Sequence, residues 1–283
     1  MPLTSFSSLR MRALALALAI LASAASLPAQ SRGAYLSDLT WPDAEARLAA
    51  ASVVIVPFGA GAKEHGPHLP LGADAITLEH LLGVAVDSTD AIVAPTILTG
   101  WFPAFREFPG TDIADPDVFW KYAYEEGASL VRHGAKRIVF LNTGVKNSTG
   151  LPLAIAAREL HARTGVPTLV LSWDDLETAE TEKLQQQKAG GHADELETSI
   201  ILVLRPSLVH MDRAVTDYHG LLGPSAPGYA PSGYSRDPKS PEYSTTGVSG
   251  DTKLATPEKG RKALAIMDAQ LIKALRTFAS ATP

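Results

Sequence analysis

The chain has 283 residues, a formal net charge of −5 and no cysteine. Without cysteine, disulfides and thiolate metal sites are excluded. The small negative charge, with no basic block along the sequence, argues against nucleic acid as a partner. The length suits one sizeable α/β domain.

The first residues predict a signal peptide. Arg10 and Arg12 precede a short apolar run at 13–22, and small residues follow it. This order is typical of a secretory leader, and the run is shorter than the roughly 20 residues of a membrane span. We expect residues 1–29 to be the leader, with cleavage after Ala24 or Ala29, and the protein to be periplasmic or secreted. No stable membrane anchor would then remain; a single uncleaved anchor is the alternative.

Strands and helices alternate along the rest of the chain. Apolar runs predict strands at 53–57, 91–95, 137–141 and 167–172. Helical spacing of apolar residues predicts helices at 75–87, 116–133, 151–164, 193–204 and 257–279. Thr256 and Pro257 suit the cap and the first position of the last helix. The alternation predicts a single domain over 30–283, a three-layer α/β/α fold with a mostly parallel central sheet.

Residues 216–250 interrupt this pattern. The segment is rich in Gly, Pro, Ser and Tyr and shows no periodicity. Long loops within a compact domain are usually functional or disordered. We expect a lid over a site or an arm in an oligomer.

Two imidazoles and two carboxylates are concentrated in residues 63–74, Lys-Glu-His-Gly-Pro-His-Leu-Pro-Leu-Gly-Ala-Asp. The segment follows the predicted strand 53–57, and open α/β sheets bind ligands beyond the carboxyl ends of their strands. Carboxylate and imidazole together suit a divalent ion such as zinc, manganese or iron. The alternative is a turn with solvated charges.

From Glu64 to Asp74 the chain resembles the creatininase family of metal-dependent amidohydrolases, whose hallmark is Glu-x-His-Gly-x-His-Leu-Pro followed by an Asp. His65 and Asp74 have the family's separation. Three later segments are similar to further family motifs, in the same order: Phe-Pro-Gly-Thr at 108–111, His-Ala-Asp-Glu-Leu-Glu-Thr-Ser at 192–199 and Thr-Gly-Val-Ser-Gly-Asp at 246–251. The resemblance covers most of residues 50–265 and implies a creatininase-like fold.

The resemblance also implies metal ligands. His65, Asp74 and Glu197 would hold one ion, and Asp74 would bridge to a second ion that also needs Glu64. Here Glu64 is adjacent to His65, whereas the family has its Glu two residues before the His, a position taken by Lys63. A one-residue bulge could still aim Glu64 at the metal; otherwise it supports the ligands.

A second departure concerns the segment after the strand at 137–141. The family typically has Asn-Gly-His-Gly-Gly-Asn there, with a ligating His, and this chain has Asn-Thr-Gly-Val-Lys-Asn at 142–147. Gly144 takes the place of that His and offers no side chain. Lys146 brings a positive charge, which we expect to contact substrate or to replace a cation. The sequence therefore predicts one firm metal site and a second that is weak, absent or replaced by Lys146.

His192 is the candidate for proton transfer, because an imidazole titrates near neutral pH and the resemblance places it in the active site. The alternative is a histidine that merely begins a helix. We expect metal-assisted hydrolysis of a C–N bond in a cyclic or linear amide, a small-molecule substrate and a homo-oligomer, as the family often forms. A non-catalytic ligand-binding protein on this fold and a metal-dependent lactone hydrolase remain alternatives.

Overall fold

The computed structural model describes residues 33–146, 148–218, 235–240 and 243–282. These residues belong to one compact unit, Gly33–Pro283. The predicted signal peptide at 1–29 lies outside the described residues, so export stays a prediction.

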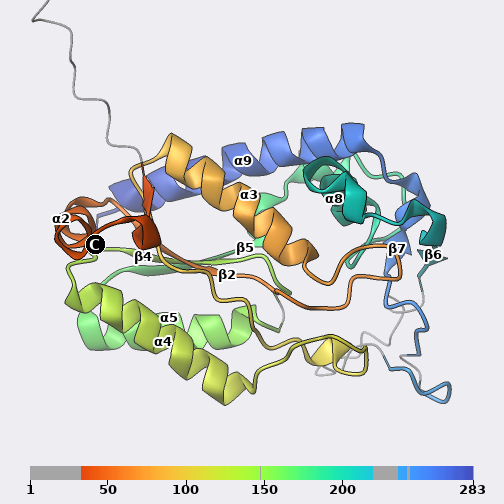
Figure 1. The fold of residues 1–283 in the computed structure, drawn as a ribbon, viewed down its shortest axis with the longest axis horizontal. Coiled ribbons are helices and arrows are strands. Elements are labelled where there is room, and N and C mark those ends of the chain that lie inside the picture. Colours follow the sequence, from red (N-terminus) through yellow and green to blue (C-terminus); the bar gives the residue numbers. More distant parts are fainter. Residues whose placement is uncertain (1–32, 147, 219–234, 241–242, 283) are drawn as a thin grey trace, which may run out of the picture. The chain divides into compact units, whose positions relative to one another are not determined.

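A parallel sheet forms the centre of the domain (Figure 1). Its five strands lie in the order β1-β3-β2-β4-β5. Its strands are β1 (Ala34–Tyr35), β2 (Val54–Phe58), β3 (Ile92–Val93), β4 (Ile138–Asn142) and β5 (Thr168–Ser172). Every residue of β2, β3 and β4 is buried. Such uninterrupted apolar strands are expected where helices cover both faces of a sheet. The four predicted strands are confirmed, with small shifts at their ends.

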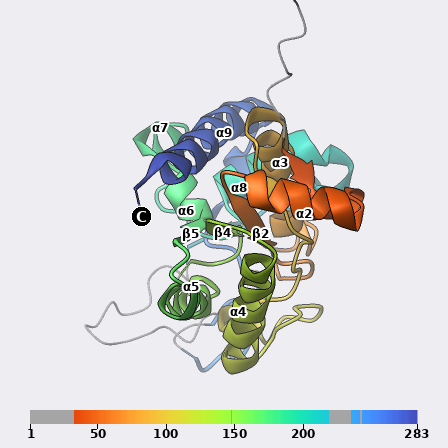
Figure 2. The same ribbon diagram turned by 90° about the vertical axis from the view of Figure 1, so that its left-hand side faces the viewer.

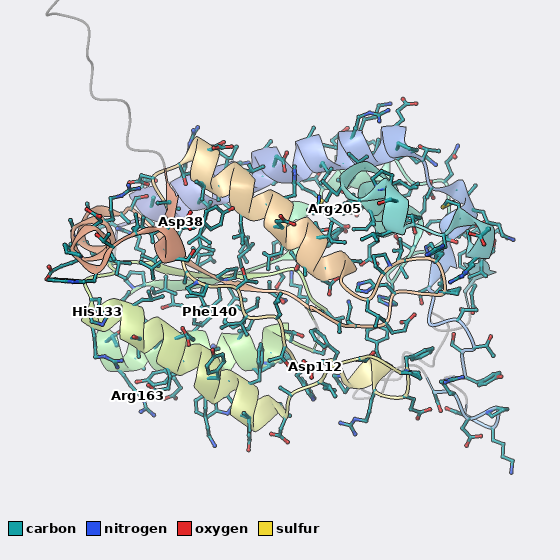
Figure 3. The ribbon with its side chains drawn as sticks, in the orientation of Figure 1. Asp38, Asp112, His133, Phe140, Arg163 and Arg205 are labelled. Carbon is teal, nitrogen blue, oxygen red and sulfur yellow. The ribbon has the colours of Figure 1, made fainter. Side chains whose placement is uncertain are left out.

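Helices cover the two faces, as Figures 1 and 2 show. On one face α4 (Pro116–Arg132) and α5 (Gly150–Thr164) pack together, and on the other lie α3 (Ala73–Ser88), α8 (Glu195–Leu204) and α9 (Pro257–Ser280). Phe140 of β4 points to the α4 and α5 side, where Phe58 contacts it edge to face at 5.4 Å between ring centroids (Figure 3). Leu141, the next residue, belongs to the core on the opposite side. The predicted three-layer α/β/α architecture is confirmed.

Several short elements complete the domain. The helices α2 (Trp41–Ala50), α6 (Trp173–Leu176) and α7 (Ala179–Glu182) lie before β2 and after β5. Single 3₁₀ turns span Leu36–Asp38, Pro103–Phe105, Pro206–Leu208, Met211–Arg213 and Thr252–Leu254. None of these short elements was predicted.

The predicted loop 216–250 begins and ends in an antiparallel pair of short strands, β6 (Thr216–Asp217) and β7 (Gly250–Asp251). Residues 219–234 and 241–242 lie outside the described part, so a lid or an oligomer arm stays a prediction. The predicted start of α9 is confirmed: Thr256 accepts a hydrogen bond from the Lys259 N–H, and Pro257 is the first helical residue. No helix in the described ranges is long and apolar enough to cross a membrane.

Candidate metal centre and active site

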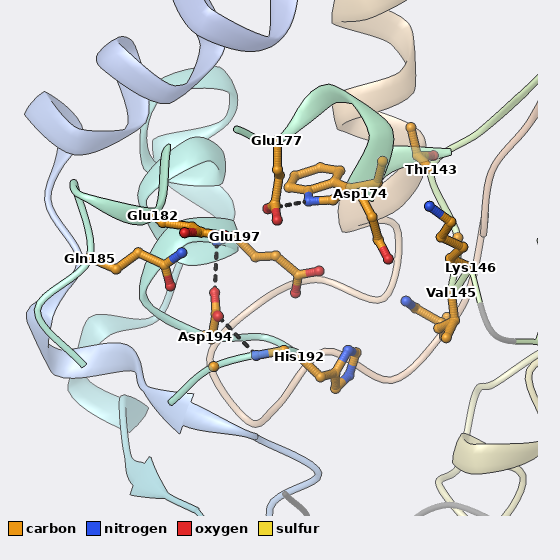
Figure 4. A pocket seen from close by; sticks show the side chains of 15 residues that line it. Thr143, Val145, Lys146, Asp174, Glu177, Glu182, Gln185, His192, Asp194 and Glu197 are labelled. Carbon is orange, nitrogen blue, oxygen red and sulfur yellow. Dashed lines mark hydrogen bonds between the residues drawn. The ribbon is translucent and has the colours of Figure 1, made fainter. Parts of the chain in front are cut away.

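A cavity of about 450 Å³ opens beyond the carboxyl ends of β4 and β5 (Figure 4). Its walls come from residues 143–146 after β4, from Trp173, Asp174 and Glu177 after β5, and from residues before and within α8, among them His192 and Glu197. This is the edge at which open α/β sheets bind their ligands. Lys63, from the loop after β2, also lines it.

The starts of two helices place carboxylates at this edge. Asp74 lies in the first turn of α3, and Glu197 lies in the first turn of α8. Unpaired N–H groups make a helix start favourable for negative charge. The Asp194 side chain caps α8 by accepting from Leu196 N at 2.8 Å and Glu197 N at 3.1 Å. The backbone oxygen of Asp74 accepts from Thr143 Oγ1 at 3.0 Å, which ties α3 to the end of β4.

His65, Asp74 and Glu197 bring one ligand atom each to within 4.8 Å of one another. We call these three residues the donor cluster. His65 and Asp74 are buried and Glu197 is partly exposed. Their side chains, with neighbours, border a void of about 10 Å³, roughly the space of one water-sized sphere. The structure thus brings together the three side chains predicted to share one ion.

The orientation of His65 suits metal ligation. Its Nδ1 lies 2.9 Å from the Lys63 carbonyl oxygen, which can only accept, so Nδ1 carries the proton in the neutral ring. Nε2 lies 2.9 Å from Asp74 Oδ1, which also only accepts, so Nε2 donates to it when no ion is bound and would give its lone pair to an ion that took the place of this proton. A backbone carbonyl on the far ring nitrogen is the usual partner of a ligating histidine. One imidazole and two carboxylates are a donor set for zinc, manganese or iron.

The two carboxylates of the donor cluster have pKa values shifted in opposite directions. Burial raises the pKa of Asp74, but Lys63 and His65 outweigh it and hold that pKa well below its usual range. Burial, with smaller contributions from Asp194 and Asp74, raises the pKa of Glu197 to about 8 against the lowering effect of Lys63. A divalent cation in the void would favour the ionised form of Glu197. The residues present therefore fit a divalent ion.

Glu64 lies outside the donor cluster and is bonded to His192. Its Oε2 lies 2.9 Å from His192 Nε2, and its Oε1 accepts from the Gly66 N–H. The backbone oxygen of Glu64 also lies 2.9 Å from His192 Nε2. Glu64 as a metal ligand stays a prediction; in this structure both of its carboxylate oxygens are bonded to groups of the chain, one of them His192.

His192 is a neutral imidazole in this setting, because burial lowers its pKa well below the usual value, and Lys63 and His65 lower it further. Both contacts of Nε2 are to acceptors, so Nε2 carries the proton and donates. Phe105 packs on the ring with 4.1 Å between centroids. Burial raises the pKa of Glu64 against its hydrogen bond from Gly66. We call these two residues the Glu64–His192 pair.

Two motif segments of the sequence enclose this pair. Gly247 has a φ of 70°, and a Cβ there would lie 2.3 Å from the Glu64 carboxyl carbon. Ser249 N donates to the His192 backbone oxygen at 2.9 Å. On the other side, Glu64 N donates to Thr111 Oγ1 at 3.1 Å. The segments 108–111 and 246–251 thus fix Glu64 and His192.

The two lysines of the site lie in different surroundings. Lys146 lines the cavity, but its Nζ is bound to Asp175 and its side chain is 43% exposed. Substrate binding by Lys146 and its replacement of a second ion stay predictions; in this structure its ammonium pairs with Asp175 and does not lie beside Asp74. Lys63 has that position: it is 2% exposed, and its Nζ lies 2.9 Å from Asp74 Oδ2. Sequence reasoning missed Lys63; the one signal was its place where the family has a Glu.

Known proteins resemble the chain along most of its length. The family model for creatininase (creatinine amidohydrolase) matches residues 37–275. Creatinine amidohydrolase of Pseudomonas putida is 27% identical over 87% of this chain and 97% of its own. A mycofactocin precursor peptide peptidase of Mycolicibacterium smegmatis is 28% identical over 76% of this chain and 81% of its own.

Solved structures agree with this match. A creatininase variant of the Zn-Zn type is 26% identical, with a TM-score of 0.72 over 89% of this chain and 100% of its own. Other matches are a manganese form of creatininase, with a TM-score of 0.68, and a variant complexed with creatine, with a TM-score of 0.69. The predicted family and the predicted hydrolase class are confirmed. The chain belongs to the creatininase family of hydrolases.

Proposed function

We propose that this chain is a metal-dependent amidohydrolase that cleaves a C–N bond in a small cyclic or linear amide. The observation that carries the proposal is the donor cluster beside the Glu64–His192 pair: Glu197 of the cluster and His192 of the pair line the same cavity. Zinc and manganese forms of creatininase among the matched structures support a divalent ion in this family. Relatives named as an amidohydrolase and a peptidase support C–N bonds as the target.

His65, Asp74 and Glu197 would hold the ion. When bound, such an ion polarises a carbonyl group and makes water acidic enough to attack near neutral pH. Asp74 is kept ionised by Lys63, and His65 is kept in the ligating tautomer by the Lys63 carbonyl. These contacts prepare the site before an ion or a substrate enters.

His192 would move the proton. With Nε2–H held by Glu64, Nδ1 carries the ring's lone pair and is the atom that takes up a proton and delivers it to the leaving nitrogen. The Glu64 carboxylate stabilises the imidazolium that forms and fixes the ring plane. Phe105 on the ring face limits its rotation and excludes water from that side. This is the arrangement of an imidazole base oriented by a buried carboxylate.

The test is turnover of a panel of lactams, cyclic ureas and linear amides by protein loaded with zinc, manganese or iron. We expect hydrolysis of at least one amide, reduced to background by His65→Ala. His161→Ala is the matched control, since His161 is an exposed residue at the end of α5. Absence of turnover on every amide by metal-loaded protein would contradict the proposal. Turnover of lactones alone would favour a lactone hydrolase, and tight binding without turnover a binding protein.

We also propose export and self-association. The charged and apolar residues at 1–29 support a cleaved leader, and cell fractionation with N-terminal sequencing of the mature chain tests it. A mature N-terminus after Ala24 or Ala29 is expected, and an intact cytoplasmic chain would contradict it. Light scattering during size-exclusion chromatography tests the homo-oligomer.

A further inference from the structure

Lys63 is a buried ammonium group at the metal centre. Its side chain is 2% exposed, and burying such a charge is costly unless it is paired. Nζ lies 2.9 Å from Asp74 Oδ2, and the rings of Phe102 and Phe105 lie 5.8 and 5.3 Å from it by centroid. Aromatic faces at these distances attract a cation. The Lys63 N–H donates to the Leu71 backbone oxygen at 2.9 Å, which fixes the loop.

The two oxygens of Asp74 face different partners. Oδ1 lies 2.9 Å from His65 Nε2, on the side of the donor cluster. Oδ2 has no well-aligned hydrogen bond to any described residue, and the Lys63 ammonium is the charge beside it. A carboxylate that bridges two ions gives one oxygen to each. If Asp74 bridged two ions, the second would have to approach Oδ2, where Lys63 Nζ already lies at 2.9 Å.

Two further features disfavour a second ion at this point. Glu64, a carboxylate that such an ion would need, has its oxygens bound to Gly66 N and His192 Nε2. Gly144 lines the cavity without a side chain, and a Cβ there would lie 2.9 Å from Phe102 Cε1. Any imidazole at Gly144 would have to displace the ring that packs near Lys63.

We infer that the Lys63 side chain, paired with Asp74, replaces the second metal ion on that carboxylate and makes this centre mononuclear. The inference rests on the proposed function, since it takes the donor cluster to hold the first ion. Lys63 has two effects. It neutralises Asp74 without a metal, and it keeps a second ion from approaching Oδ2. The positive charge in the site then comes from the Lys63 side chain and from one exchangeable ion.

The experiment measures metal content and spin coupling. Purified protein is saturated with Mn²⁺ or Zn²⁺, freed of loose metal and analysed by elemental mass spectrometry and native mass spectrometry. We expect one ion per chain and the electron paramagnetic resonance spectrum of an isolated Mn²⁺. Lys63→Glu, which exchanges the cation for a carboxylate, is expected to bind a second ion at least tenfold more tightly than Lys63→Arg, which keeps the cation.

The control variant is Lys146→Met, which removes the other cavity lysine and is expected to keep one ion per chain. Two tightly bound ions in the wild type, or a spin-coupled Mn²⁺ pair, would overturn the inference whether or not Lys63→Glu folds. So would a folded Lys63→Glu with no gain over Lys63→Arg. Two ions together with amide turnover would leave the proposed function standing, whereas a wild type that holds no ion would overturn both.

Discussion

The donor cluster and the Glu64–His192 pair are neighbours that balance their charges differently. The His65 and His192 rings lie 5.2 Å apart by centroid. In the Glu64–His192 pair, both carboxylate oxygens accept hydrogen bonds from groups of the chain. In the donor cluster, two carboxylates and an imidazole surround a small void, and the nearest cation of the chain lies on the far oxygen of Asp74.

This difference separates two tasks within one site. A group of donors around a void gains free energy when a cation enters, because buried carboxylates are costly without one. A pair that is already satisfied gains nothing from a metal and can hold a proton instead. The structure thus favours metal binding at the donor cluster, which contains His65, and proton transfer at the Glu64–His192 pair.

Asp74→Asn should have the largest effect, because it removes a carboxylate of the donor cluster and the partner of Lys63. We expect loss of metal and a fall in the free energy of unfolding of about 3–5 kcal/mol, the usual cost of leaving one member of a buried ion pair alone. Metal content and urea unfolding measure the two effects. Asp268→Asn is the matched control: its ion pair with His80 is partly exposed, with both side chains 27% exposed, and should contribute less than about 1 kcal/mol. Retained metal in Asp74→Asn would contradict the comparison.

Glu64→Gln tests the other half of the comparison. Because the Glu64 carboxylate is hydrogen-bonded to His192 Nε2, the proposed proton carrier, we expect kcat to fall by about 10–100-fold with the metal content unchanged. Steady-state kinetics on the best amide and elemental analysis measure both. Loss of metal in Glu64→Gln would show instead that Glu64 is a ligand after all.

Much of the fold could be predicted because its signals are local. The strands β2 and β4 are continuous apolar runs, and each run is visible without knowledge of its neighbours. The start of α9 was predicted for the same reason, since Thr256 and Pro257 carry its cap. In contrast, β1 has two residues, both only partly buried, and depends on pairing with β3. No pattern within so short a segment distinguishes it from a loop.

In the site, too, the features with local sequence signals could be predicted and those that depend on distant contacts could not. His65, Asp74 and Glu197 could be proposed as ligands from their motifs, and the fold brings them together. The partner of Glu64 could not be predicted, because His192 lies far along the chain and the choice between metal and imidazole depends on three-dimensional contacts. Lys63 was missed for a related reason. A loop lysine is expected to be exposed, and its burial requires Phe102, Phe105 and the first turn of α3.

Gly247→Ala should disturb the Glu64–His192 pair more than the donor cluster. The left-handed φ of 70° and the 2.3 Å approach of a Cβ to Glu64 predict a loss of about 1–3 kcal/mol in the free energy of unfolding and displacement of Glu64. Gly83→Ala is the matched control, because a Cβ in that helical position of α3 meets nothing within 4 Å and should stabilise by about 0.5–1 kcal/mol. Equal stability of the two variants would contradict the role of Gly247.

His68 supports the donor cluster from behind and gives the smallest expected effect. It is fully buried, and its Nε2 lies 2.7 Å from Oγ1 of Thr198, the residue after Glu197. Its Nδ1 has no hydrogen-bond partner among the described residues. Burial lowers the pKa of His68 to about 4, while Glu64 raises and His65 lowers it. The ring is therefore neutral in the folded protein at neutral pH.

The pH dependence follows from that shift. Between about pH 6.5 and pH 4 the unfolded chain binds a proton on His68 that the folded chain does not, so this contribution to stability is complete above pH 6.5 and is lost as the pH falls. From pH 7 to pH 5 the wild type should lose about 1–2 kcal/mol more than His68→Gln, measured by urea unfolding at each pH. Other titrating groups cancel in this difference. If the free energy of unfolding changed equally with pH in the wild type and in His68→Gln, His68 would not be held neutral. If His68→Gln lost its metal, His68 would be a metal ligand and not only a supporting residue.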